Sequence, residues 1–208
     1  MIRKIEELLK RSGIPVFGYA KTEGIKIYGE IEPLPFAISF GMVLSRSILM
    51  TITDRPSLIY KHHYRTVNNY LDQVGLRLTE LLEVSGYQAL PIPASQIIDW
   101  ENQFGHLSHR EIARRAGLGW IGRSGLLIHP KYRAAVRFAT VLTDLELPGG
   151  KELPFGCGDC FRCLEACPAQ AITEDGVDLR KCYQKLREFA KIRGIGQYIC
   201  GVCIKACL

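Results

Sequence analysis

Apolar residues recur at helical spacing in two stretches of the first half of the chain. Residues 2–11 place their apolar side chains on one face and are followed by Gly13, which predicts a short N-terminal helix. From Ser57 onward the apolar positions alternate steps of four and three, so one long amphipathic helix is expected to end near Gly86. Its apolar stripe consists of Tyr60, Tyr64, Val67, Leu71, Val74, Leu78 and Leu81.

Shorter apolar runs bounded by glycine and proline predict strands. These runs are Val16–Ala20, Phe36–Val43, Tyr87–Ile92 and Ala135–Leu142. Ser108 and Glu111 have the spacing of a capping box, so another helix is expected to start there and run to Arg115. Because helices alternate with strands, the pattern predicts an α/β or α+β core.

Cysteine is confined to one end of the chain. All eight cysteines lie between Cys157 and Cys207, and a joint rich in proline and glycine covers residues 147–156. With 208 residues and 47% hydrophobic content, the chain can form one main domain and a small appendage. We therefore expect a core domain over residues 1–150 and a cysteine-rich domain over residues 151–208.

Hydropathy and charge indicate where the protein is expected to work in the cell. No apolar stretch approaches the roughly 20 residues of a membrane-spanning helix, and the first residues lack the apolar segment of a secretory signal. A cytoplasmic protein with reduced thiols and no membrane association is expected. The net charge of +6 is compatible with an acidic partner, but lysines and arginines are spread along the chain, as on an ordinary solvated surface.

The first four cysteines carry the most specific motif. Cys157, Cys160, Cys163 and Cys167, followed by Pro168, reproduce the C-x2-C-x2-C-x3-C-P run of bacterial ferredoxins. In that run three thiolates hold one 4Fe-4S cluster, while the fourth is expected to start a helix and to bind the other cluster. Each cluster therefore needs one ligand from elsewhere in the chain.

The remaining cysteines complete two sets of four. A second run has lost its first member, and the isolated Cys182 is available to replace it. One cluster is assigned to Cys157, Cys160, Cys163 and Cys207, and the other to Cys167, Cys182, Cys200 and Cys203. Zinc sites or disulfides are the alternatives, and the four-cysteine run with its proline favours clusters over both. Two adjacent clusters indicate electron relay, and a purely structural role is the less favoured alternative.

Residues 114–122, Arg-Arg-Ala-Gly-Leu-Gly-Trp-Ile-Gly, resemble a motif of epoxyqueuosine reductase, a cobalamin-dependent tRNA-modifying enzyme related to reductive dehalogenases. The order of the cysteines, including the isolated Cys182, also resembles that family. Further similarity covers Ser124–Pro130 and Phe138–Pro148 and, more loosely, Pro35–Ser45 and Tyr60–Leu82. The resemblance implies a nitroreductase-like core followed by a bacterial-ferredoxin-like double-cluster domain.

The same resemblance implies that the core binds a base-off corrinoid beside the nearer cluster. Glycines in the motif would let backbone approach a large planar ligand, with Trp120 as an apolar wall, although a tight structural turn would need the same glycines. The histidine pair at residues 62–63 on the long helix is a further candidate, as an anchor for the corrinoid tail or as a proton donor, unless both are ordinary surface residues. The expected corrinoid contacts are Tyr64, Arg65, Gly117, Gly119, Trp120, Gly122 and His129.

The sequence departs from the family at its proton donor. Gln103 stands near the position of the family's catalytic aspartate, and Asp99 reaches that position only if the loop is realigned. His106 and His109 are the alternative proton sources. The sequence ends at Leu208 without the family's C-terminal helical-repeat region, so tRNA is not the expected substrate.

Two functions follow from these features. The first is an iron-sulfur oxidoreductase that passes electrons from a donor such as flavodoxin or ferredoxin, through two 4Fe-4S clusters, to a corrinoid that reduces an unidentified substrate. The second is a ferredoxin-type carrier or a reductive activator of a partner such as a corrinoid protein, without substrate chemistry of its own.

Overall fold

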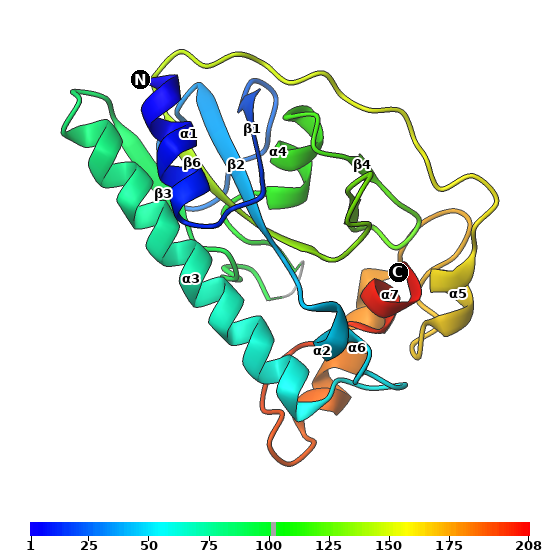
Figure 1. The fold of residues 1–208 in the computed structure, drawn as a ribbon. Helices are drawn as coiled ribbons and strands as arrows, with labels where there is room; N and C mark the ends of the chain where they lie inside the picture. The colour runs from blue at the N-terminus through cyan, green and yellow to red at the C-terminus, as the bar shows by residue number, and fades with distance from the viewer. Residues whose placement is uncertain (101–102) are drawn as a thin grey trace. The chain divides into compact units, whose positions relative to one another are not determined.

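The computed structural model describes residues 1–100 and 103–208 and has a mixed α/β fold (Figure 1). The chain divides into two compact units, each assembled from three segments. The first unit contains Met1–Val43, Val67–Gly119 and Arg137–Leu153, and the second contains Leu44–Thr66, Trp120–Val136 and Pro154–Leu208. All eight cysteines lie in the second unit, together with two segments from earlier in the chain. The expected domain boundary after residue 150 stays a prediction.

A four-stranded sheet in the order β1-β2-β6-β3 forms the centre of the first unit. Strand β1 is antiparallel to β2, and β3 is antiparallel to β6. The strands are β1 (Val16–Lys21), β2 (Phe36–Val43), β3 (Ala89–Ile92) and β6 (Val136–Thr143).

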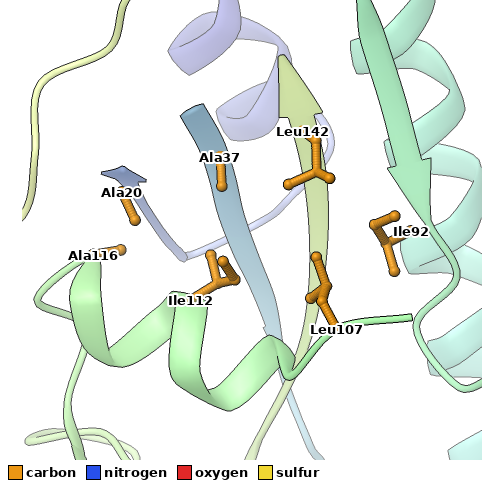
Figure 2. Packing of buried hydrophobic residues seen from close by; sticks show 7 residues of the cluster. All are labelled: Ala20, Ala37, Ile92, Leu107, Ile112, Ala116 and Leu142. Atoms are coloured by element: carbon orange, nitrogen blue, oxygen red, sulfur yellow. The ribbon is translucent and has the colours of Figure 1, made fainter. Parts of the chain in front are cut away.

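Helices cover both faces of this sheet. Helix α4 (His109–Arg115) lies on one face, where small and branched apolar side chains fill the space between helix and strands (Figure 2). The buried residues there are Ala20, Ala37, Ile92, Leu107, Ile112, Ala116 and Leu142. Helix α3 (Leu58–Glu83) packs on the other face, since a Cβ added at Gly75 would lie 3.7 Å from the Phe40 ring and 3.9 Å from Val141.

The second unit is built mainly from short elements. The strands β4 (Trp120–Ile121) and β5 (Leu127–Ile128) form an antiparallel pair. The helices assigned to it are α2 (Arg46–Leu49), α5 (Arg162–Ala166), α6 (Leu179–Ala190) and α7 (Val202–Ala206). Among residues 1–100 and 103–208, no helix has both the length and the apolar character needed to cross a bilayer.

Most of the predicted regular elements are confirmed. The N-terminal helix is α1 (Ile2–Arg11), and the long helix is α3, whose buried residues include Val67, Leu71, Val74 and Leu78. The stripe closes on the buried Leu82 instead of Leu81. The strands are confirmed with shifts of one or two residues at their ends.

Three local predictions need correction. No helix starts at Cys167: α5 ends at the residue before it, and Cys167 itself is extended, because the proline that follows disfavours helical backbone. Ser108 caps α4 by accepting a hydrogen bond from the backbone N–H of Glu111, but the Glu111 carboxylate pairs with Arg114 and completes no reciprocal cap. The glycine-rich loop also contains β4.

A matched pair of leucines on α3 tests the packing of the first unit. Leu78 is fully buried, whereas Leu76 is 55% exposed on the same helix. Leu78→Ala should lower the free energy of unfolding by about 2–5 kcal/mol, because it removes buried methyl groups and leaves a cavity. Leu76→Ala should change it by less than about 1 kcal/mol. Equal losses in urea-induced unfolding would contradict this packing of α3.

Candidate functional site

Four thiols from two distant parts of the sequence gather at one place in the second unit. Burial raises the pKa of Cys163, and the neighbouring thiols of Cys207, Cys157 and Cys160 raise it further. Burial likewise raises the pKa of Cys207, and Cys157 again contributes. Because thiolates repel one another only at short range, these four cysteines are neighbours. Helices α5 and α7, which carry Cys163 and Cys203, pack against each other.

The other four thiols form a second, more deeply buried group. Burial raises the pKa of Cys182, and the nearby Cys167 adds to the shift. Burial raises the pKa of Cys200 to about 11, with Cys182 and Cys167 among its neighbours. The pKa of Cys203 is raised most strongly, by burial first and then by the thiols of Cys200, Cys182 and Cys167. These two groups contain the same residues as the predicted sets, whose role as ligands stays a prediction.

The two groups adjoin each other. Cys203, in the second group, also interacts with Cys163 in the first. In the part of the chain that the structure describes, no three His, Cys, Asp or Glu side chains converge as they would around a single metal ion.

Trp120 lies beside the first group. Its indole N–H donates a hydrogen bond to the sulfur of Cys157 over 3.4 Å. Two glycines make room for this contact: a Cβ at Gly156 would lie 2.9 Å from the indole ring, and one at Gly122 would lie 3.2 Å from the Cys157 sulfur. Trp120 and Gly122 were predicted to contact a corrinoid, and the structure places both against a cysteine of the first group.

Arginines surround the loop that carries the first cysteines, and sequence reasoning did not identify them. The guanidinium of Arg123 stacks over the Phe161 ring at 4.3 Å and donates a hydrogen bond to the Gly158 carbonyl over 2.8 Å. Arg162 donates a hydrogen bond to the exposed thiol of Cys160 and lowers its pKa. Their positions in the sequence could have indicated them, because Arg123 directly follows the glycine motif and Arg162 lies within the cysteine run.

The other predicted corrinoid residues divide between the two units. Gly117 and Gly119 belong to the first unit, where Gly117 has a φ of +73° and lies close to the backbone of Lys151. This contact explains Gly117 as a structural turn. In the second unit, Arg65 lines a groove of about 530 Å³ together with Lys61 and the loop at residues 192–197.

The tyrosine and histidine side chains of the second unit that were considered for corrinoid binding make local contacts. The Tyr64 ring packs on Tyr60, with centroids 6.4 Å apart. The Nδ1 atom of His129 accepts hydrogen bonds from the backbone N–H groups of Lys131 and Tyr132, which fits a turn. His62 is exposed, whereas His63 Nε2 accepts a hydrogen bond from the backbone N–H of Ser45 over 3.1 Å.

The two histidines predicted as proton donors hold the first unit together. The Nδ1 atom of His106 lies 3.1 Å from the Tyr28 carbonyl, to which it can only donate. His109 Nε2 lies 3.0 Å from the Pro93 carbonyl, and its Nδ1 lies 2.9 Å from the Thr140 hydroxyl. Nε2 therefore carries the proton of the neutral ring, and Nδ1 accepts from Thr140. Their proposed catalytic roles stay predictions.

Gln103 and Asp99, the two residues weighed for the position of the family's aspartate, make local contacts. Gln103 has a φ of +62°, and its side-chain amide donates to the Trp100 carbonyl. The backbone of Asp99 pairs with that of Phe104, with an N···O distance of 3.1 Å. Gln103 is thus engaged locally, and it has no proton to donate as a carboxylic acid would.

Comparison with known proteins identifies the relatives of this chain. It is 28% identical to the epoxyqueuosine reductase of Aliivibrio fischeri over 157 residues, which are 71% of this chain and 39% of that protein. It is 32% identical to a tetrachloroethene reductive dehalogenase of Desulfitobacterium hafniense over 176 residues, or 82% of this chain and 29% of that protein. The chain is homologous to both kinds of reductase. No family model matches it.

Solved structures of these reductases share the fold. A catabolic reductive dehalogenase aligns with 98% of this chain at a TM-score of 0.76 and 19% identity, using 31% of its own length. The epoxyqueuosine reductase of Streptococcus thermophilus aligns with all of it at a TM-score of 0.65 and 21% identity, using 65% of its length. A further reductive dehalogenase has a structure that suggests a mechanism for B12-dependent dehalogenation. It aligns with 98% of this chain and 30% of its own length, at a TM-score of 0.74 and 18% identity. This chain thus spans less than two thirds of these relatives.

His109 should make the first unit sensitive to acid. Burial lowers its pKa to about 4 from an ordinary value of 6.5. Between these two pH values His109 binds a proton in the unfolded chain but not in the folded chain. The free energy of unfolding therefore falls as the pH drops from about 6.5 to about 4. The expected loss is about 1–3 kcal/mol.

Urea-induced unfolding at several pH values checks this expectation. His109→Gln should be less stable than the unchanged protein at neutral pH, and the difference should shrink as the pH falls. His62→Gln is the matched control, because His62 is exposed. A difference that stays constant from pH 7 to pH 4 would show that His109 is not held neutral.

Proposed function

We propose that this chain is an iron-sulfur oxidoreductase that passes electrons through two 4Fe-4S clusters to a bound corrinoid, which reduces a substrate still to be identified. The observation that carries this proposal is the gathering of all eight cysteines into two adjacent groups of four in the second unit. Each group has four cysteines, the number whose thiolates a 4Fe-4S cluster requires. The ferredoxin-type spacing of the first run supports the same ligation.

In this proposal the clusters exchange one ligand each. Cys207 joins the first run, while Cys167 leaves it to join Cys182 and the second run. The electrostatic interaction between Cys163 and Cys203 supports a short path for electrons between the clusters. An external donor such as flavodoxin or ferredoxin would supply the electrons, and the exposed Cys160 with its neighbouring Arg162 suits an acidic donor.

The corrinoid in this proposal rests on homology and on one groove. The structure of one reductive dehalogenase with this fold suggests a mechanism for B12-dependent dehalogenation, which supports the same cofactor and a nitroreductase-like core for this chain. Lys61 and Arg65 stand one helical turn apart and line the groove in the second unit. Two cations suit the phosphate of a corrinoid tail. A bound corrinoid would supply a strongly reducing cobalt centre.

A second candidate function is electron delivery without substrate chemistry. Gln103, His106 and His109 are all engaged in hydrogen bonds within the first unit. This observation favours a ferredoxin-type carrier or a reductive activator of a corrinoid protein. Reduction of epoxyqueuosine in tRNA is disfavoured, because Gln103, and not a carboxylic acid, stands near the position of the family's catalytic aspartate.

Combinations of cysteine variants test the two groups. Cys160→Ala and Cys182→Ala should each remove one cluster, so anaerobically purified protein should lose about half of its iron and acid-labile sulfide. The double variant of these two should lose nearly all of it. The double variant Cys157→Ala with Cys160→Ala should still lose only about half. Loss of all iron from that last variant, or stoichiometric zinc in the unchanged protein, would contradict the proposal.

Titration with cobalamin tests the corrinoid part. The anaerobic protein should convert added cobalamin to the base-off form, which is visible in its absorption spectrum. Arg65→Ala should weaken binding roughly tenfold, because a charge-assisted contact with the phosphate is lost. Arg77→Ala, at an exposed position on the same helix, should not. An unchanged spectrum in a protein with both clusters would exclude the corrinoid and favour the carrier.

A further inference from the structure

The hydrogen bond from Trp120 to Cys157 is a side-chain contact made directly to a thiol of the first group. The indole nitrogen and the sulfur are 3.4 Å apart, within the second unit. Neutral indole N–H groups only donate, so the direction of this bond is certain. Nothing in the predicted corrinoid role of Trp120 required such a contact.

Both ends of this hydrogen bond are held in place. The backbone of Trp120 pairs with Ile128 between β4 and β5, and the turn after β4 is closed by the Gly122 N–H bonding to the Leu126 carbonyl over 2.9 Å. The ring lies against Gly156, where a Cβ would be 2.9 Å from it. Replacing this glycine by a larger residue would push the ring away from the sulfur.

We propose that Trp120 is a positioning residue that raises the reduction potential of the cluster bound through Cys157. This inference rests on the proposed function, because it presupposes a 4Fe-4S cluster on the first group. A cluster held there would become more negative on accepting one electron from the external donor, and its sulfurs would become better hydrogen-bond acceptors. An N–H donor on a ligating sulfur therefore stabilises the reduced form more than the oxidised form.

The second group provides an internal reference for this effect. Backbone N–H groups donate to its sulfurs, from Ala171 to Cys167 over 3.4 Å and from Val202 to Cys200. A change at Trp120 leaves these backbone donors in place. The potential of the second cluster should consequently stay constant while that of the first one moves.

The experiment compares Trp120→Phe with the unchanged protein, both purified anaerobically with their clusters. Redox titration followed by electron paramagnetic resonance should show one midpoint potential shifted to a more negative value and the other unchanged. The matched control is Trp100→Phe, at the chain's other tryptophan, which lies in the first unit and is 49% exposed. It should leave both potentials where they are.

A second substitution separates the hydrogen bond from the shape of the ring. Incorporation of 3-benzothienylalanine at position 120 keeps the bicyclic ring and replaces the N–H by sulfur. The iron content should be unchanged, and the same midpoint potential should fall as in Trp120→Phe. If both clusters are present and both potentials stay unchanged in this protein, the role of Trp120 is refuted while the proposed function stands. If the unchanged protein holds no clusters, both proposals fail.

Discussion

The arrangement of the second unit depends on one chemical requirement, that each proposed 4Fe-4S cluster receives four thiolates. The first run has four cysteines, but its spacing lets three of them reach one cluster. The chain must therefore return to the same place with Cys207, while Cys167 turns to the other group. The extended backbone of Cys167, imposed by the proline after it, is compatible with this turn away from α5.

The surroundings of the two groups differ, and this difference has consequences for electron transfer. The first group includes an exposed thiol and has an indole N–H and an arginine as hydrogen-bond donors. The second group includes the deeply buried Cys203 and Cys200. Hydrogen bonds and solvent exposure set the potentials of such clusters, so the two proposed clusters should not be equivalent. A relay with two unequal potentials has a preferred direction.

The first unit shows how polar residues in a sequence can have structural roles that resemble catalytic ones. His109 comes just after a cap, near the position of the family's active-site loop, and it would be a suitable proton donor at neutral pH. In the structure it joins Pro93 to Thr140 as a neutral ring. Burial keeps the ring uncharged, so substrate chemistry at this position would require the ring to move.

The sequence by itself determined the long helix, the strands, the cysteine motif and the relationship to the reductases, because these depend on periodicity and on spacing within short segments. Only the tertiary structure decided what lies beside each cysteine. Trp120 is 37 residues before Cys157, and only folding places its N–H on that sulfur. The same holds for His109, since its partners come from residues 16 and 31 positions away. Contacts between distant segments leave no periodic signal, so the positioning role of Trp120 could not be read from the pattern of residues.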